Sequence, residues 1–242
     1  DAWYFQAGRQ PEMPFSVLLE AGLQPCGWLA AYLGSALTSA TDLKFRNLDG
    51  NSVQHRPVTP QSGTLTTKVK ITRIASSGGM IIQNFEMDVH NNGKCVYQGT
   101  TNFGFFTQSS LSNQVGIRDS QFTTVSFSKI DSPEIFFTED APLTPQDNNI
   151  GKNSGMPSKA LRMIDHIEQL DPDGGLYQKG YIKAIKKVNP EEWFFDAHFY
   201  QDPVMPGSLG VESVMQALAV FALHQDLGDG FTSPKFTQIE GT

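Results

Sequence analysis

A short segment that occurs twice in this chain restricts the possible folds more than any other feature of the sequence. The run from Met13 to Glu20, followed by Gln24, matches the run from Met205 to Glu212, followed by Gln216. The two runs keep a constant offset, because 206 − 14 = 192. A repeat that keeps its register in this way predicts two copies of one structural unit.

The similarity resumes further along, where residues 43–50 parallel residues 234–241 at an offset of 235 − 44 = 191. In each copy a glutamate, Glu20 or Glu212, falls one helical turn before a glutamine on a segment that is otherwise mostly apolar. A carboxylate on an apolar helix needs a polar partner or a water-filled cleft. Both glutamates are therefore candidates for a functional role.

The first half of the chain predicts one long helix followed by an antiparallel meander. Residues 14–37 are expected to form the helix, and Pro25 is expected to kink it or split it. Three strand-like runs follow at 64–75, 80–90 and 95–107, separated by segments rich in glycine and asparagine that are typical of hairpin turns. The simplest packing places these strands against the apolar helix, which makes the fold α+β.

The second half begins with a connector and then returns to regular elements. Residues 126–159 are rich in Pro, Asp, Asn, Gly and Ser, as in a linker. Strands are expected at 177–188 and 193–198, and the second long helix follows them. We therefore expect a first copy over residues 1–125 and a second copy over residues 160–242.

Charge and cysteine content exclude several classes of protein. The net charge is −7, the pI is near 5.2, and no long run of Lys or Arg offers a nucleic-acid surface. The two cysteines, Cys26 and Cys95, belong to no CxxC motif, so neither a disulfide framework nor a zinc site is indicated. Cys26 lies on the apolar helix, where we expect it to be buried rather than to act as a nucleophile.

No segment of the sequence predicts a membrane span or a secretory signal. The longest apolar stretch, from Leu23 to Leu37, contains Gln24 and Pro25 and is shorter than a membrane span. The chain opens at Asp1 without a basic start and a cleavage site. We expect a cytoplasmic protein.

His198 lies shortly before a Pro-Gly pair and the second long helix. A histidine in this position can move protons near neutral pH, and the first free amides of the helix, beginning at Gly207, can polarise a carbonyl group. Together these groups indicate acyl chemistry. The alternative is a packed or solvated histidine with no catalytic role.

Residues 160–242 resemble a family of known enzymes. An ordered string runs through Lys179-Gly180-Tyr181, residues 189–195 and residues 198–210. It resembles the bifunctional bacterial beta-hydroxydecanoyl-ACP dehydratase/isomerases. Residues 18–28 of the first copy resemble the paired dehydratase-type domains of the multienzyme synthases that make polyunsaturated fatty acids. The resemblance implies hotdog folds, in which an antiparallel sheet wraps a long central helix, with two copies in tandem as a double hotdog.

The resemblance also implies a site between two hotdogs, with a histidine from one and an acid from the other. Carried over, His198 takes the histidine position and Glu212 the acid position, where the bifunctional enzymes have Asp. By the repeat, Glu20 is the matching acid of the first copy, so His198 and Glu20 form the expected catalytic pair. Gly207 is implied to bind the thioester oxygen through its amide.

Two glutamines and a missing histidine complete the implied site. Gln24 is expected to orient Glu20 from one turn away, and Gln216 has the same place beside Glu212. Counting back 192 residues from His198 gives Gln6, and aligning residues 3–5 with residues 193–195 instead gives Gly8. Neither residue can abstract a carbon-bound proton. Only one competent site is therefore expected.

The implied reaction is dehydration of beta-hydroxyacyl thioesters to trans-2-enoyl thioesters, with double-bond isomerisation as a further implied activity. No cofactor or metal is expected, because the substrate is carried on the phosphopantetheine of an acyl carrier protein. That carrier and other domains of a multienzyme synthase are the implied partners. An acyl-thioesterase and a non-catalytic acyl- or carrier-binding half of a synthase stay open as alternatives.

Two further expectations concern partners. Four lysines on one predicted strand could attract an acidic carrier protein, or they could form a solvated strand face; they are Lys179, Lys183, Lys186 and Lys187. The second copy stops at Thr242, where the strands of the first copy would begin. Either the sequence is a fragment of a longer protein, truncated at both ends, or another molecule supplies the strands, as in a homodimer.

Overall fold

The structure is a computed structural model, and it describes residues 2–113, 135–136, 156–199, 201–232 and 240–241. Most of the expected connector, 126–159, lies outside these residues. The chain divides into two compact units. We call residues 15–118 with 237–242 the sheet unit, and residues 1–14 with 119–236 the histidine unit. The expected copy boundaries stay a prediction.

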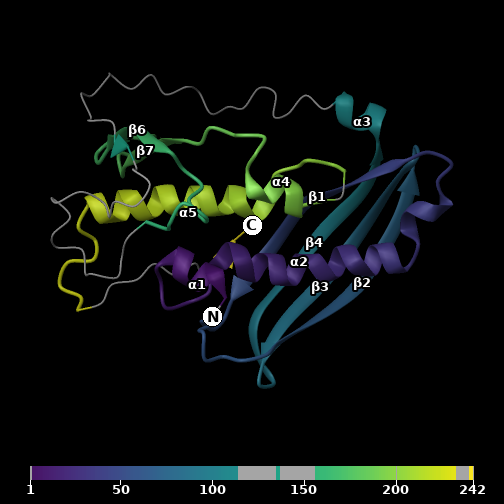
Figure 1. The fold of residues 1–242 in the computed structure, drawn as a ribbon, viewed down its shortest axis with the longest axis horizontal. Coiled ribbons are helices and arrows are strands. Elements are labelled where there is room, and N and C mark those ends of the chain that lie inside the picture. Colours follow the sequence, from purple (N-terminus) through teal and green to yellow (C-terminus); the bar gives the residue numbers. More distant parts are fainter. Residues whose placement is uncertain (1, 114–134, 137–155, 200, 233–239, 242) are drawn as a thin grey trace. The chain divides into compact units, whose positions relative to one another are not determined.

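The sheet unit consists of a long helix and an antiparallel sheet of long strands. Its sheet has the strand order β2-β3-β4-β1-β8, in which each pair of neighbours is antiparallel (Figure 1). Its elements are α2 (Phe15–Tyr32), the 3-10 helix η1 (Ser35–Thr38), β1 (Leu43–Gln54), β2 (Leu65–Ser77), β3 (Met80–Asn91), β4 (Lys94–Thr107), α3 (Gln108–Ser112) and β8 (Glu240–Gly241).

The three strands that the sequence predicts in the first half of the chain are confirmed as β2, β3 and β4. The turns between them also have the expected chemistry. Gly78 and Gly79 have φ values of 58° and 77°, and Asn92 and Gly93 have φ values of 48° and 76°. Two consecutive left-handed residues are what a tight hairpin turn requires. The strand β1 was not predicted, although its first residues belong to the repeat.

Pro25 does not interrupt the first long helix. The expected kink or split would follow from the missing N–H of proline, which leaves the carbonyl oxygen of Ala21 without its donor four residues later. Here the hydroxyl of Thr67, on β2, donates to that oxygen at 3.0 Å. Because the sheet supplies the missing donor, α2 continues as one helix from Phe15 to Tyr32.

One face of α2 is buried against β2, β3 and β4. Gly22 lets the helix come close to the sheet, because a Cβ atom there would lie 2.9 Å from Sδ of Met87. Tyr97 on β4 and Phe85 on β3 belong to the core of this unit and are almost wholly buried. The apolar face that the sequence places on this helix therefore forms the core of the sheet unit.

The histidine unit surrounds a second long helix with short elements. Its three-stranded antiparallel sheet has the order β5-β6-β7. Its elements are α1 (Trp3–Gly8), β5 (Ile135–Phe136), β6 (His166–Asp171), β7 (Tyr181–Ile185), α4 (Trp193–Ala197) and α5 (Gly207–His224). Two apolar clusters hold α5 in place, one around Phe194 and Leu209 and the other around Ile167 and Val220.

The prediction of a strand over residues 193–198 is wrong, because residues 193–197 form the short helix α4. Its aromatic run favoured a strand, but a turn at Asn189 starts a helix instead. The Asn189 side chain accepts from the amide of Glu191 at 3.1 Å, and its carbonyl accepts from the amide of Glu192 at 3.0 Å. The helical turn places Phe194 fully inside the core, so tertiary packing overrides local propensity.

The predicted strand over 177–188 is present but shorter, as β7 from Tyr181 to Ile185. Gln178 and Gly180 have φ values of 52° and 121°, which are incompatible with an extended backbone at those positions. The strand therefore begins only at Tyr181.

The two long helices agree with the repeat at both ends. Each has 18 residues, and they share one offset, since 207 − 15 = 192 and 224 − 32 = 192. They nevertheless bury different faces. Gly22 and Cys26 are buried in α2, whereas their counterparts Val214 and Leu218 in α5 are 60% and 58% exposed. The surroundings of each helix, and not its repeated sequence, decide which face is buried.

We predict that the two cysteines differ in reactivity. Cys26 is fully buried, and burial raises the pKa of its thiol to about 12, so it is a neutral thiol at pH 8. Cys95 is half-buried. Iodoacetamide at pH 8 should label Cys95 of the folded protein and spare Cys26, as read by peptide mass spectrometry. In denaturant both should react, and equal rates in the folded protein would contradict the burial of Cys26.

Candidate active site

His198 lies at the C-terminal end of α4, in the histidine unit, and is half-buried. Its Nδ1 lies 2.6 Å from the carbonyl oxygen of Val204. A carbonyl oxygen can only accept, so Nδ1 carries the hydrogen of the neutral ring. Nε2 is left with the lone pair and can act as a base. The backbone of a nearby residue therefore selects the tautomer that proton abstraction requires.

The loop between His198 and Val204 is folded tightly enough to bring these two groups together. Phe199 and Gln201 have φ values of 58° and 54°, in the left-handed region that non-glycine residues rarely adopt. The ring of Phe199 lies over the imidazole, with centroids 4.0 Å apart. Uncommon backbone conformations beside a candidate base are typical of functional sites.

Gly207 is the first residue of α5 and follows Pro206. Pro206, the N-terminal cap, makes no side-chain hydrogen bond to this helix, and the amide of Gly207 lies at the helix end. A Cβ atom at Gly207 would meet no other atom within 4 Å. A group with a partial negative charge can therefore approach the helix end here, and the helix dipole would stabilise it.

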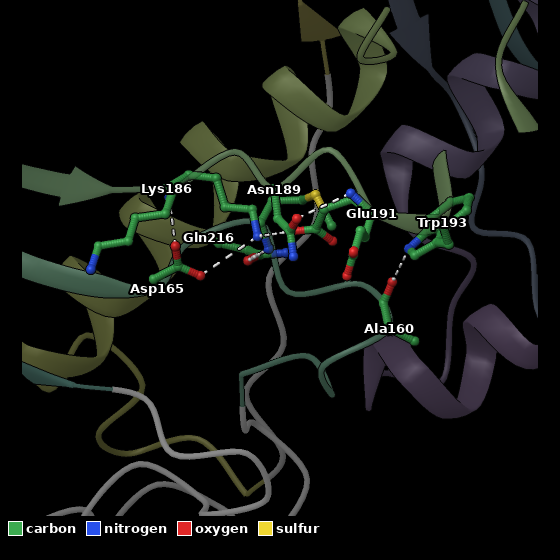
Figure 2. A network of polar contacts seen from close by, with 10 residues as sticks. Ala160, Asp165, Lys186, Asn189, Glu191, Trp193 and Gln216 are labelled. Carbon is green, nitrogen blue, oxygen red and sulfur yellow. Dashed lines mark hydrogen bonds and ion pairs between the residues drawn. The ribbon is translucent and has the colours of Figure 1, made fainter. Parts of the chain in front are cut away.

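Glu212 and Gln216 lie on α5 and are 6% and 3% exposed. Gln216 makes three hydrogen bonds. Its Nε2 donates to Oε1 of Glu212 at 2.8 Å and to the carbonyl oxygen of Leu161 at 2.8 Å, and its Oε1 accepts from the amide of Met163 at 2.8 Å. Figure 2 shows Gln216 within this polar network. Gln216 thus joins α5 to the segment before β6 and satisfies polar groups that are out of contact with water.

Glu20 and Gln24 lie on α2, in the sheet unit. Glu20 is half-buried, and Gln24 is exposed. Burial raises the pKa of the Tyr97 hydroxyl to about 12, and the negative charge of Glu20 is one of the smaller causes of the rise. Glu20 therefore lies close enough to the sheet core to affect its electrostatics. The orientation of Glu20 by Gln24, and the pairing of Glu20 with His198, stay predictions.

Sequence reasoning missed several groups that shape this site. The carbonyl of Val204 is a backbone group, so the residue type at this position gives no sign of its role. The sequence marks Lys186 only as one of four lysines on a predicted strand, although the carboxylates of Asp165 and Glu192 are candidate partners for it. It contacts both, at 3.5 Å and 2.7 Å.

Neither a membrane span nor a metal cluster occurs in the part of the chain that the structure describes. No helix there is both long and apolar enough to cross a membrane. Among the same residues, no three His, Cys, Asp or Glu side chains gather where they could hold a metal ion.

The long helix against an antiparallel sheet is an α+β arrangement consistent with a hotdog fold. Residues 1–100 and 156–242 match the model of the FabA-like domain. The chain therefore belongs to the FabA-like domain family, whose known members include hotdog dehydratases.

One curated relative is similar over the whole chain. It is a polyunsaturated fatty acid synthase subunit of Thraustochytrium sp., which is 31% identical over 253 residues that cover 100% of this chain and 17% of that protein. The chain thus spans about a sixth of the length of this relative.

Two solved structures show weaker likeness. HtdX of Mycobacterium tuberculosis matches with a TM-score of 0.27 and 11% identity, over 42% of this chain and 41% of that one. A hypothetical protein from Aquifex aeolicus matches with a TM-score of 0.28 and 12% identity, over 41% of this chain and 88% of that one. Neither likeness is close enough to support a conclusion about function.

We predict that the two repeated glutamines differ in their importance for stability. Gln216→Ala removes three buried hydrogen bonds and leaves an amide and a carbonyl unpaired, which should cost about 2–4 kcal/mol of unfolding free energy. Gln24→Ala, at the matching position, should change stability by less than about 0.5 kcal/mol, because Gln24 is exposed. Urea unfolding of the three proteins measures both. Similar losses in the two variants would refute the difference in environment.

Proposed function

We propose that this chain carries the site of a 3-hydroxyacyl-ACP dehydratase, which converts beta-hydroxyacyl thioesters to trans-2-enoyl thioesters in fatty acid or polyunsaturated fatty acid synthesis. Membership of the FabA-like family supports a dehydratase role. The observation that carries the proposal is the hydrogen bond from Nδ1 of His198 to Val204, because it leaves Nε2 as a base.

The proposed reaction begins at the carbon next to the thioester carbonyl. Nε2 of His198 removes a proton from this carbon, and negative charge builds up on the thioester oxygen. The amide of Gly207, at the positive end of α5, donates a hydrogen bond to that oxygen. The electron pair then forms the double bond as the beta-hydroxyl group leaves. Glu20 gives this group a proton, so that it departs as water.

The choice of Glu20 over Glu212 as the acid rests on their surroundings. Glu212 is buried and accepts a hydrogen bond from Gln216, which bonds two backbone groups at the same time. Such a carboxylate is suited to a structural role. Glu20 is half-buried and has an exposed glutamine as its neighbour one turn later. The assignment requires the two repeat copies to form a double hotdog, which is part of this proposal.

The substrate would reach the site on the phosphopantetheine arm of an acyl carrier protein, so that no cofactor is needed. The name of the Thraustochytrium relative supports other synthase domains as partners. Of the four lysines expected on one strand, only Lys183 lies on β7. Two of the four are engaged with carboxylates, Lys183 with Glu168 and Lys186 with Glu192. They therefore offer less positive charge to a carrier than the sequence indicates. Homodimer formation and a cytoplasmic location stay predictions.

We predict that His198→Ala abolishes the conversion of a beta-hydroxyacyl thioester to its enoyl product, with a loss of at least about 100-fold in kcat. The assay should use the longer protein that contains this chain and should follow enoyl absorbance. His224→Ala is the matched control, because His224 is exposed at the end of α5. This variant should retain full activity. Enoyl formation by a folded His198→Ala protein would refute the role of His198 as the base.

The same assay separates the alternative functions. Free acid in place of enoyl product would indicate a thioesterase. Binding of the thioester without turnover would indicate a non-catalytic acyl- or carrier-binding half of a synthase. Movement of the double bond in an enoyl substrate would add isomerisation to the proposed activity.

We also predict unequal effects at the two repeated acids. Glu20→Gln removes the proposed proton donor and should lower kcat by about 100-fold or more. Glu212→Gln keeps an oxygen that can accept from Gln216 and should retain most of the activity. Steady-state kinetics of both variants, each checked for folding by circular dichroism, give the comparison. Equal losses would exclude the pairing of His198 with Glu20.

A further inference from the structure

The position of His198 depends on α4, a helix of five residues. A helix of this length is not stable in isolation, so tertiary contacts must hold it. His198 directly follows the helix, and its amide donates to the carbonyl oxygen of Phe194 at 2.9 Å. Any contact that moves α4 therefore also moves the imidazole relative to Val204.

The apolar side of α4 is anchored by Phe194 and Trp193. Phe194 is fully buried in a cluster with Leu161 and Leu209. The indole N–H of Trp193 donates to the carbonyl oxygen of Ala160 at 3.0 Å. These contacts anchor α4 from its first residue, Trp193, but they do not include Glu192, the residue directly before the helix.

Glu192, directly before α4, is held by an ion pair with Lys186 in addition to the turn at Asn189. Nζ of Lys186 lies 2.7 Å from Oε1 of Glu192 and 3.5 Å from Oδ1 of Asp165. The Lys186 and Glu192 side chains are only 16% and 22% exposed. Ion pairs shielded from water in this way are less screened than surface pairs, and losing one partner costs more.

Asp165 connects this ammonium group to the β6–β7 ribbon. Its other oxygen, Oδ2, accepts from the amide of Lys187 at 2.6 Å, and its own amide donates to the carbonyl oxygen of Ile185 at 2.8 Å. Figure 2 shows Asp165, Lys186, Asn189 and Trp193 in one network. Lys186 thus joins a fixed part of the ribbon to the start of α4.

We propose that Lys186 is a positioning residue for His198: its bridge between Asp165 and Glu192 fixes α4 so that Nδ1 of His198 stays on the carbonyl of Val204. Without this ammonium group, the two carboxylates that it joins repel each other, and their repulsion loosens the start of α4. The ring then loses its single hydrogen-bond acceptor and its single tautomer. The consequence for catalysis rests on the proposed function, whereas the consequence for the tautomer does not.

The test is the tautomer of His198, measured by ¹⁵N NMR of histidine-labelled protein at a pH where the ring is neutral. The unchanged protein should show Nδ1 protonated and Nε2 bare. Lys186→Met should show a mixture of both tautomers, and Lys186→Arg, which keeps the cation, should restore the single form. A single Nδ1-protonated tautomer in folded Lys186→Met would overturn the proposal.

Lys183→Met is the matched control. Lys183 lies on the same ribbon and pairs with Glu168, but these side chains are 49% and 41% exposed, and their ion pair does not involve α4. This variant should leave the His198 spectrum unchanged, and a mixed tautomer in it would also overturn the proposal. If Lys186→Met does not fold, Glu192→Met removes the same link with Lys186 in place. Retention of the single tautomer in Glu192→Met would likewise count against it.

Kinetics provide the second readout. In Lys186→Met, kcat should fall by about tenfold or more with KM within about twofold, because a misplaced base impairs the chemical step rather than binding. Lys186→Arg should recover most of kcat. If the unchanged protein lacks dehydratase activity, the proposed function fails, but the NMR comparison still decides whether Lys186 positions His198.

Discussion

The hydrogen bond between Nδ1 of His198 and the carbonyl oxygen of Val204 is the contact on which the candidate site depends, because it decides which ring nitrogen is basic. It forms because α4 places the imidazole on one side and the tight loop that follows places the carbonyl oxygen of Val204 on the other. In that loop Phe199 and Gln201 adopt the left-handed backbone conformation, which is unfavourable for residues other than glycine. The packing around Phe194 and the bridge at Lys186 hold the helix side of the contact.

The two repeat copies show how one sequence pattern comes to lie in two different environments. A glutamate followed one turn later by a glutamine occurs on both long helices. On α5 the glutamine is buried and bonds the glutamate and two backbone groups, which makes Gln216 part of the internal structure. On α2 the matching Gln24 is exposed. The difference lies in what surrounds each helix, so the same pair of residues is buried in one copy and half-buried or exposed in the other.

Local chemistry in the sequence predicts several elements well. The glycine pair at Gly78 and the Asn92-Gly93 pair require left-handed backbone, and both form the expected hairpins. Prediction fails where a distant residue decides the outcome. Pro25 would interrupt an isolated helix, but the hydroxyl of Thr67 replaces its missing donor. The aromatic run after Glu192 favours a strand by propensity, but burial of Phe194 makes it helical.

The first long helix covers residues 15–32 and not the expected 14–37, but the sequence by itself determined the shared register of the two long helices, the hairpins of the sheet and the identity of His198 as the candidate base. These features depend on periodicity, turn chemistry and an ordered motif, all of which are local along the chain. Only the tertiary structure decided the protonated nitrogen of His198, the buried face of each helix and the partners of Lys186. Those properties depend on groups that are brought together by folding, such as Val204 with His198 and Thr67 with Ala21.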